Sequence, residues 1–345
     1  MEIGIIGAPQ SGKSTLFTAI TGVEPGNEVG KRAVVKVPDP RLDHLTDVFK
    51  PKKKINATVN FIDAPPPQSM SAKRGSAPSF LGFIKTVDAI LVVAACYRDG
   101  GAKELQDIME MLLLSDLEVI EGILARENKI KIDPKYSGPS MELLRKLAGE
   151  LEQMKMLRNI ELSEKELASL SGVQLFTKYP TFVALNISEN DIKGELKGEA
   201  KKAADYLDSI KTPYIAVCAP IEAEIATLPD EDRESFMQEY GLESTASDRV
   251  IQEVYDLLGY QTFFTVGDDE CRAWTIRKGD NAVTAAGKVH SDIAKGFIRA
   301  ECCTYEDLLA SDNSLQKAKA NAKLRLEGKE YIVKDGEICH FRHSG

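Results

Sequence analysis

Short apolar runs recur along the first two thirds of the chain and alternate with stretches that have helical periodicity. Six runs predict strands: IGIIG at 3–7, AVVKV at 33–37, ATVNFID at 57–63, AILVVAAC at 89–96, TFVALN at 181–186 and YIAVCA at 214–219. Almost uninterrupted apolar strands that alternate with helices are typical of a mainly parallel sheet with helices on both faces. The pattern predicts an α/β fold, with the second and third runs as a hairpin-like edge. Between those two runs, a short helix is expected to end in a basic loop, KPKKK at 50–54.

Between the fourth and fifth runs the apolar residues change to a three-four spacing. Two sets keep this spacing: Leu105, Ile108, Leu112 and Val119, then Leu144, Leu147, Leu151 and Met154. The sets predict an antiparallel helical hairpin inserted into the sheet domain over 99–172. Ordinary amphipathic helices lying on that domain explain the same periodicity equally well.

From about residue 261 the chain changes to short strands and tight turns, which predict a separate α+β domain. EYIVKDGEICHFR is a hairpin candidate whose two alternating arms meet at Asp335-Gly336. The predicted organisation is a nucleotide-binding domain at 1–98 and 173–260, the helical insertion at 99–172 and a tail domain at 261–345.

Composition restricts the setting in which the protein works. The net charge is −9, so any nucleic-acid contact would need a local basic patch. The six cysteines form no CxxC pair and no Cys/His spacing typical of zinc sites, so reduced thiols in a cytoplasmic protein are expected. No apolar run approaches the ~20 residues of a membrane span, so no membrane partner is expected.

The segment GAPQSGKS, Gly7 to Ser14, fits the pattern G-x-x-x-x-G-K-[ST] between a strand and a helix. Glycines allow the backbone to approach phosphate oxygens, and the helix N-terminus supplies free N–H donors. In such loops the lysine, here Lys13, contacts the β- and γ-phosphates, and the hydroxyl, here Ser14, binds Mg²⁺. Lys13 is therefore also the candidate catalytic residue, since it would stabilise the transferring phosphoryl group.

Asp63 ends the third apolar run and is the second candidate ligand of Mg²⁺. In P-loop switch proteins the residue three positions later is normally a glycine whose N–H senses the γ-phosphate. Here that residue is Pro66, which has no N–H. Losing one charge-assisted hydrogen bond of roughly 1.5–3 kcal/mol would reduce discrimination between nucleoside triphosphate and diphosphate by about tenfold to a hundredfold. Lys73 or Arg74 is a candidate replacement.

The fifth apolar run leads into Asn186, Ile187 and Glu189, a candidate base-binding segment. GTP-binding proteins carry Asn-Lys-x-Asp here, and their aspartate accepts two hydrogen bonds from guanine. Glutamate is longer by one methylene, which misplaces the carboxylate and weakens that pairing. Adenine offers a donor and acceptors that the amide of Asn186 can match. An adenine nucleotide is favoured, with GTP as the alternative.

Taken together, motifs along nearly the whole chain resemble the YchF (Obg-like ATPase) family. They include GAPQSGKSTLF, VPDPRLDHL, ATVNFID and NISE, and, near the end, GYQTFFTVG, RAWTIRKG, AAGKVHSDIAKGFIRAE and LRLEGKEYIVKDGEICHFR. The resemblance implies a G domain with an inserted helical hairpin and a C-terminal TGS domain. It also implies ATP preference and association with ribosomes.

The resemblance also assigns ligand-binding roles to individual positions. Phosphate contacts would come from Gln10, Ser11, Gly12, Lys13, Ser14 and Thr15, and Mg²⁺ ligation from Ser14 and Asp63. Asn186, Ile187 and Glu189 would lie at the base, to which Ala219 would offer a backbone N–H.

The regions that would switch with the nucleotide depart from the family pattern. The segment after Gly22 is too short to supply the usual threonine, and the pattern Asp-x-x-Gly is replaced by Asp63-Ala64-Pro65-Pro66. Two hypotheses remain. One is a slow, ribosome-associated ATPase. The other is a non-hydrolysing, nucleotide-held module whose TGS domain contacts RNA or ribosomal protein. In either case the TGS and helical domains are the candidate contacts to the ribosome or RNA.

Overall fold

The computed structural model describes residues 1–23, 30–64, 86–127 and 138–344, apart from the side chain of Asp230. The chain divides into two compact units, which we describe separately. The first comprises Met1–Val35 and Asn60–Val250, and the second comprises Lys36–Val59 and Ile251–Gly345.

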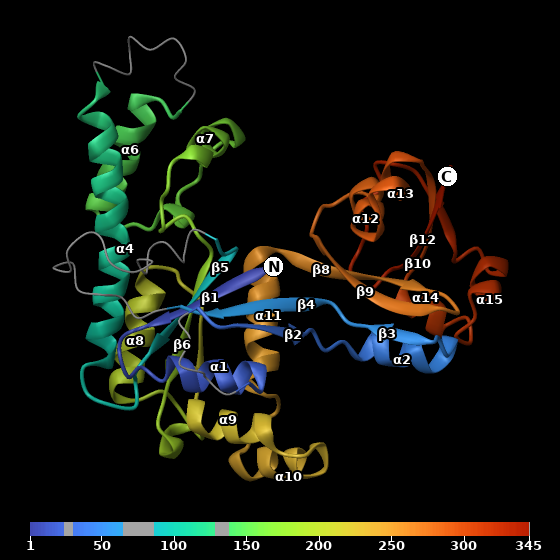
Figure 1. Ribbon diagram of the computed structural model, residues 1–345, viewed down its shortest axis with the longest axis horizontal. Helices are drawn as coiled ribbons and strands as arrows, with labels where there is room; N and C mark the ends of the chain where they lie inside the picture. The colour runs from blue at the N-terminus through green and yellow to red at the C-terminus, as the bar shows by residue number, and fades with distance from the viewer. Residues whose placement is uncertain (24–29, 65–85, 128–137, 345) are drawn as a thin grey trace. The chain divides into compact units, whose positions relative to one another are not determined.

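A mainly parallel sheet forms the centre of the first unit (Figure 1). Its strand order is β2-β4-β1-β5-β6-β7, and the pairs from β4 through β7 are parallel. The strands are β1 (Glu2–Gly7), β2 (Arg32–Lys36), β4 (Thr58–Asp63), β5 (Ala89–Ala94), β6 (Thr181–Asn186) and β7 (Tyr214–Val217). All residues of β5 and β6 are buried. The predicted α/β fold with a P-loop is thus confirmed.

Helices of the first unit pack against the sheet and against one another. The helices are α1 (Lys13–Thr21), α4 (Gly101–Leu124), α6 (Met141–Glu152), α7 (Glu164–Ser169), α8 (Gly198–Ser209), α9 (Ala219–Thr227), α10 (Asp230–Tyr240) and α11 (Ala246–Leu258), which continues into the second unit. α1 packs against α9, whereas α4 packs against α8 and β5. After the carboxyl ends of β1 and β7 the chain enters α1 and α9 within a few residues, so these two helices can hold a ligand-binding edge.

The helical insertion contains α4 and α6, which lie side by side (Figure 1). Leu105 and Leu112 of α4 and Leu144, Leu147 and Leu151 of α6 are all buried, as the spacing predicts. The seam ends one turn earlier than expected, because the chain leaves the helix at Met154 with a left-handed φ of 61° and 42% exposure.

Asp116, on the inner face of α4, connects the insertion to the chain that enters β6. Its carboxylate accepts hydrogen bonds from the backbone N–H groups of Phe176 (2.5 Å) and Thr177 (2.7 Å) and from the Thr177 hydroxyl (2.6 Å). Burial raises the pKa of Asp116, and these donors oppose the shift. The aspartate thereby fixes α4 to the segment that enters β6.

The second unit contains another sheet, with strand order β11-β10-β12-β8-β9-β3. Its strands are β3 (Lys53–Ile55), β8 (Tyr260–Val266), β9 (Glu270–Arg277), β10 (Phe297–Cys303), β11 (Arg325–Glu327) and β12 (Ile338–His343). Its helices are α2 (Pro40–Phe49), α12 (Ala282–Val289), α13 (Ser291–Lys295), α14 (Tyr305–Leu309) and α15 (Leu315–Ala320). The mixture of strands and helices agrees with the predicted α+β tail.

Residues 36–59 belong to this second unit, although the sequence pattern placed them in the nucleotide domain. The expected basic loop contains a strand, β3, which pairs in parallel with β9 from Lys53↔Glu270 to Ile55↔Arg272. In α2, Leu42 and Leu45 are fully buried, and Arg41 forms an ion pair with Asp335. The predicted three-domain boundaries remain a prediction, but the tail unit includes this distant segment.

The predicted hairpin at Asp335-Gly336 is wrong. A turn does form there, with Gly336 at φ 76°, but β12 pairs with β10 and β8, and residue 332 makes only an isolated bridge to residue 281. The turn is instead bound to β8, because Asp335 accepts from the Thr262 N–H and the Gly336 N–H donates back to the Thr262 carbonyl. These contacts replace hairpin pairing.

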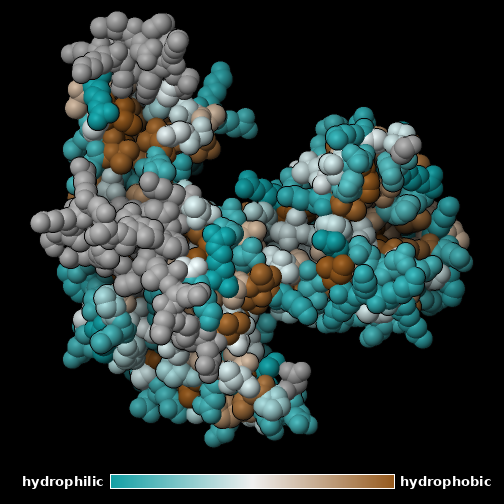
Figure 2. All heavy atoms as spheres, viewed as in Figure 1, coloured by the Kyte–Doolittle hydropathy of each residue, from teal (hydrophilic) through white to brown (hydrophobic). Residues whose placement is uncertain are grey.

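Within the described ranges, no helix is both long enough and apolar enough to cross a membrane. On the face shown in Figure 2, hydrophilic residues cover most of the second unit and apolar residues form small separate spots. Exposed large apolar side chains of this unit, such as Ile298, Leu309 and Leu326, come from different elements. Such scattered apolar surface is ordinary for a folded domain.

Candidate nucleotide-binding site

The phosphate loop lies between the end of β1 at Gly7 and the start of α1 at Lys13. Gln10 and Gly12 have left-handed backbone conformations, with φ 61° and 87°. A Cβ on Gly12 would lie 2.1 Å from the amide nitrogen of Asn186, so both its φ and its surroundings require glycine. No described side chain caps the N-terminus of α1. Its first N–H groups therefore remain available for an anion.

Lys13, Ser14 and Asp63 meet at the start of α1 and the end of β4. Lys13 forms an ion pair with Asp63, and these side chains are only 11% and 14% exposed. The Ser14 hydroxyl donates to the other carboxylate oxygen of Asp63 at 3.3 Å. A hydroxyl and a carboxylate are the oxygen ligands that Mg²⁺ takes in such sites, so this pair fits the ion. The structure thus brings together both predicted metal ligands and the lysine predicted to bind phosphate.

Asn186, at the end of β6, links the phosphate loop to the N-terminus of α9. Its amide nitrogen donates to the Ser11 carbonyl at 3.0 Å, and its amide oxygen accepts from the Ala219 N–H at 3.0 Å. Asn186 and Ala219 are 2% and 0% exposed. In the structure both groups thus join two loops, and their predicted contact with the base stays a prediction.

A cavity of about 430 Å³ adjoins the phosphate loop, a volume typical of small-molecule sites. Three chain segments far apart in sequence supply its walls: Gly12 and Thr15; Asn186, Ile187, Ser188 and Glu189; and Cys218, Pro220 and Ile221. Tyr97, after β5, completes the lining. The walls are mainly apolar. Two of the predicted phosphate residues, Gly12 and Thr15, therefore border the same space as three predicted base residues, Asn186, Ile187 and Glu189.

Glu189 points its carboxylate to a partner that the sequence did not indicate. The Tyr240 hydroxyl, from the end of α10, donates to Glu189 at 2.9 Å, and this hydrogen bond raises the pKa of Tyr240. Burial raises the pKa of the Cys218 thiol on the opposite segment, so this wall carries no charge. The predicted base end of the cavity thus contains the Glu189 carboxylate, which the Tyr240 hydroxyl holds in place, and otherwise mainly apolar groups.

Tyr97 is a site residue that sequence reasoning missed. Its hydroxyl donates to the carbonyl of Gln10 at 2.5 Å, although the two residues are 87 positions apart. This contact supports the left-handed conformation of Gln10, which is unfavourable for a residue with a side chain. The available signal was an aromatic residue directly after the fourth apolar run, where ligand sites of parallel sheets lie.

Several predicted features fall outside the described residues. They are Pro66, Lys73, Arg74 and most of the segment after Gly22. The question of how the γ-phosphate is sensed therefore stays a prediction. The described part supports binding of phosphate and base.

Two family models match the chain. One, described as a 50S ribosome-binding GTPase, matches residues 2–124. The other, named YchF-GTPase_C and described as a protein of unknown function, matches residues 260–344.

Similar proteins align over almost the entire chain. The ribosome-binding ATPase YchF of Bacillus subtilis is 38% identical over 365 residues, covering 99% of each chain. The YchF of Escherichia coli is 37% identical over 366 residues, covering 99% of this chain and 98% of that one. A solved structure of the Schizosaccharomyces pombe YchF GTPase superposes with a TM-score of 0.84 at 27% identity, over 99% of this chain and 97% of that chain. A GTP-binding protein of Pyrococcus horikoshii, at TM-score 0.63 and 18% identity over 100% of both chains, shares the fold.

Proposed function

The chain belongs to the YchF family, and we propose that it binds an adenine nucleotide with Mg²⁺ and hydrolyses ATP slowly in association with the ribosome. The observation that carries the proposal is the contact of Lys13, Ser14 and Asp63 at the start of α1, directly beside Gly12 and Thr15, which line the cavity next to Asn186. Curated relatives at 37–38% identity bear the name ribosome-binding ATPase, which supports the choice of nucleotide and partner.

The described residues suit the chemistry of phosphoryl transfer to water. Lys13 would leave Asp63 and hold the β- and γ-phosphates, while Ser14 and Asp63 would hold Mg²⁺. When bound, Mg²⁺ neutralises charge on the phosphates. Free N–H groups at the start of α1 would stabilise the same charge, and Tyr97 would keep the loop in its binding conformation through Gln10.

Adenine preference is supported by the base end of the cavity. Ile187 is 5% exposed and occupies the position of the lysine that guanine sites carry. Glu189 is already engaged by Tyr240, which draws its carboxylate toward α10 and away from the two-point pairing that guanine needs. Binding of GTP is the alternative.

A second candidate function is a nucleotide-held binding module without turnover. The prolines after Asp63, in a place where switch proteins need an N–H donor, favour it. In either case we propose that the helical insertion and the tail unit contact ribosomal RNA or protein. A cytoplasmic location would follow from that association.

Competitive titration with Mg²⁺ present tests the proposal. A non-hydrolysable ATP analogue and ADP are expected to bind at least about tenfold tighter than the matching guanine nucleotides. The ATP analogue and ADP should themselves differ by less than about tenfold, because Pro66 cannot supply the sensing hydrogen bond. Phosphate release is expected to be slow but measurable.

The outcomes separate the candidate functions. Guanine nucleotides binding as tightly as adenine nucleotides would contradict adenine preference. Nucleotide binding without phosphate release above a protein-free blank would contradict hydrolysis and support the second candidate function, the binding module. A chain that binds no nucleotide in the presence of Mg²⁺ would overturn both.

A double substitution tests how the base is read. Ile187→Lys with Glu189→Asp restores Asn-Lys-x-Asp and should shift the ratio of guanine to adenine affinity toward guanine by at least about tenfold, because the shorter carboxylate can pair with guanine. The measurement is competition between ADP and GDP. Glu195→Asp, an exposed change of the same type in the following loop, serves as the control and should leave the ratio unchanged. An unchanged ratio in the double variant would place the base elsewhere.

A further inference from the structure

A compact group of metal-ligating side chains lies in the core of the second unit, separate in sequence from every residue of the nucleotide site. Cys302 of β10 and Cys339 of β12 are direct cross-strand partners, and Glu337 comes two residues before Cys339. Their donor atoms all lie within 4.8 Å of one another. The three residues are 0%, 2% and 0% exposed. The sequence shows no metal-site spacing for this group, because 37 positions separate the two cysteines.

The separation of the two sulfur atoms suits one shared tetrahedral ion. The Sγ atoms are 3.7 Å apart. Two thiolates bound to one Zn²⁺ at about 2.3 Å and at a tetrahedral angle are separated by about 3.8 Å. A disulfide requires about 2.05 Å, and a linear two-thiolate complex places the sulfurs on opposite sides of the ion. Zn²⁺ therefore needs the least movement of these strands.

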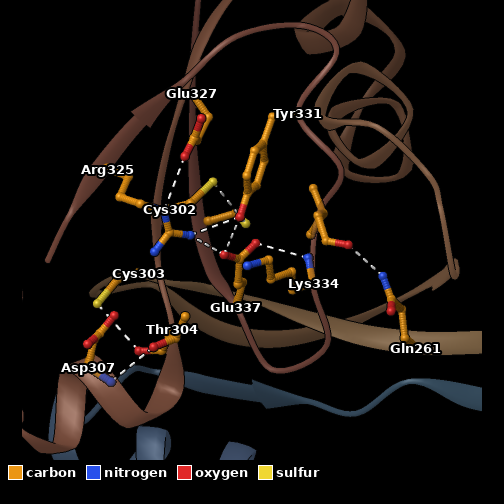
Figure 3. A network of polar contacts seen from close by, with 12 residues as sticks. Gln261, Cys302, Cys303, Thr304, Asp307, Arg325, Glu327, Tyr331, Lys334 and Glu337 are labelled. Carbon is orange, nitrogen blue, oxygen red and sulfur yellow. Dashed lines mark hydrogen bonds and ion pairs between the residues drawn. The ribbon is translucent and has the colours of Figure 1, made fainter.

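Glu337 is held as a ligand would be. One carboxylate oxygen accepts from the Tyr331 hydroxyl at 2.6 Å and from Arg325, and the other accepts from the Lys334 N–H at 3.0 Å (Figure 3). A carboxylate oxygen has two acceptor positions, so the oxygen that accepts from Lys334 keeps one free. Such supporting hydrogen bonds fix the orientation of metal-binding carboxylates.

Charge balance allows a cation in this buried place. Arg325 forms ion pairs with both Glu337 and Glu327, and a protonated thiol carries no charge. If both thiols lose their protons when Zn²⁺ binds, the two thiolate charges balance the two positive charges of the ion, and the net charge of the group does not change. The large cost of burying an uncompensated charge is thereby avoided.

We propose that Cys302, Cys339 and Glu337 form a Zn²⁺ site that is filled as the second unit folds. The ion connects β10, β12 and the turn that precedes β12. Three protein donors leave the fourth tetrahedral position to a small ligand such as water. Cys303 supplies an internal contrast, since it follows Cys302 on the same strand but points the other way, toward Thr304 and Asp307 (Figure 3).

The test uses the full chain, produced in zinc-supplemented medium and purified with a mild chelator. Metal analysis is expected to find about one Zn²⁺ per chain, as a folding-coupled structural site would retain. Cys302→Ala and Cys339→Ala should each reduce the content at least about tenfold, whereas Cys303→Ala should keep it. Chain refolded with Co²⁺ should show sulfur-to-cobalt charge-transfer absorption. Ser14 and Asp63 cannot produce that band, because neither carries sulfur.

Three results would overturn the proposal. The first is wild-type chain that contains no zinc after growth in zinc-supplemented medium. The second is equal zinc content in Cys302→Ala and wild type. The third is an intact mass two hydrogens lower under non-reducing conditions, which indicates a disulfide. If an alanine variant does not fold, Glu337→Gln tests the same metal site. It keeps the shape and both cysteines, and it should weaken Co²⁺ binding and shift the cobalt spectrum.

Discussion

Replacing Lys13 by alanine is expected to weaken binding of Mg²⁺-ATP and Mg²⁺-ADP by at least about a hundredfold. An ammonium group that reaches phosphate makes charge-assisted hydrogen bonds worth roughly 1.5–3 kcal/mol each, and a hundredfold corresponds to about 2.7 kcal/mol. Lys13 is positioned for this role at the first turn of α1, where it forms its ion pair with Asp63. Fluorescence titration or calorimetry measures the change.

Lys201→Ala is the matched control for this prediction. Lys201 also pairs with an aspartate, Asp205, but lies on the surface of α8 with a side chain that is 59% exposed. A surface pair contributes little, so nucleotide affinity and stability should stay near wild type. Asp63→Asn is a second test. It leaves Lys13 in place, but it should abolish the increase in nucleotide affinity that Mg²⁺ causes. Wild-type affinity in Lys13→Ala would contradict a phosphate-binding role for this loop.

Local patterns predicted the phosphate half of the site because its parts are adjacent in the chain. Strand, glycine turn and helix follow one another from β1 to α1, and hydrogen bonds within a few residues fix their geometry. Asp63 was predictable for a related reason. It ends an apolar run, and the ends of neighbouring parallel strands meet at one edge of a sheet.

The parts that sequence reasoning missed depend on contacts between distant segments. Tyr97 reaches Gln10, and Tyr240 reaches Glu189, through the packing of helices and strands that no local pattern encodes. Residues 36–59 were assigned to the nucleotide domain because they lie between two of its strands. Their membership of the second unit depends on β9, more than 200 positions later. The hairpin at Asp335-Gly336 failed for the same reason, since its backbone pairs with Thr262 instead.

Asn186→Ala is expected to damage stability and nucleotide binding together. The substitution removes the hydrogen bonds to the Ser11 carbonyl and from the Ala219 N–H, and it leaves both backbone groups buried without these partners. Each of the two orphaned groups costs about 1–3 kcal/mol, so the free energy of unfolding should fall by about 2–6 kcal/mol. Nucleotide affinity should fall at least about tenfold, because Gly12 loses the amide that packs beside it. Chemical denaturation measures the first effect and titration the second.

Two further variants distinguish this joining role from direct reading of the base. Asn159→Ala removes an exposed asparagine that also donates to a carbonyl, that of Ile210, and should change stability by less than about 1 kcal/mol. Asn186→Asp keeps the acceptor for Ala219 but places a carboxylate against the Ser11 carbonyl. It should therefore destabilise the fold even without nucleotide. If Asn186 acts only on the base, both Asn186 variants will unfold like wild type and lose affinity for one base alone. A joining role predicts destabilisation of the free protein and equal loss for ADP and GDP.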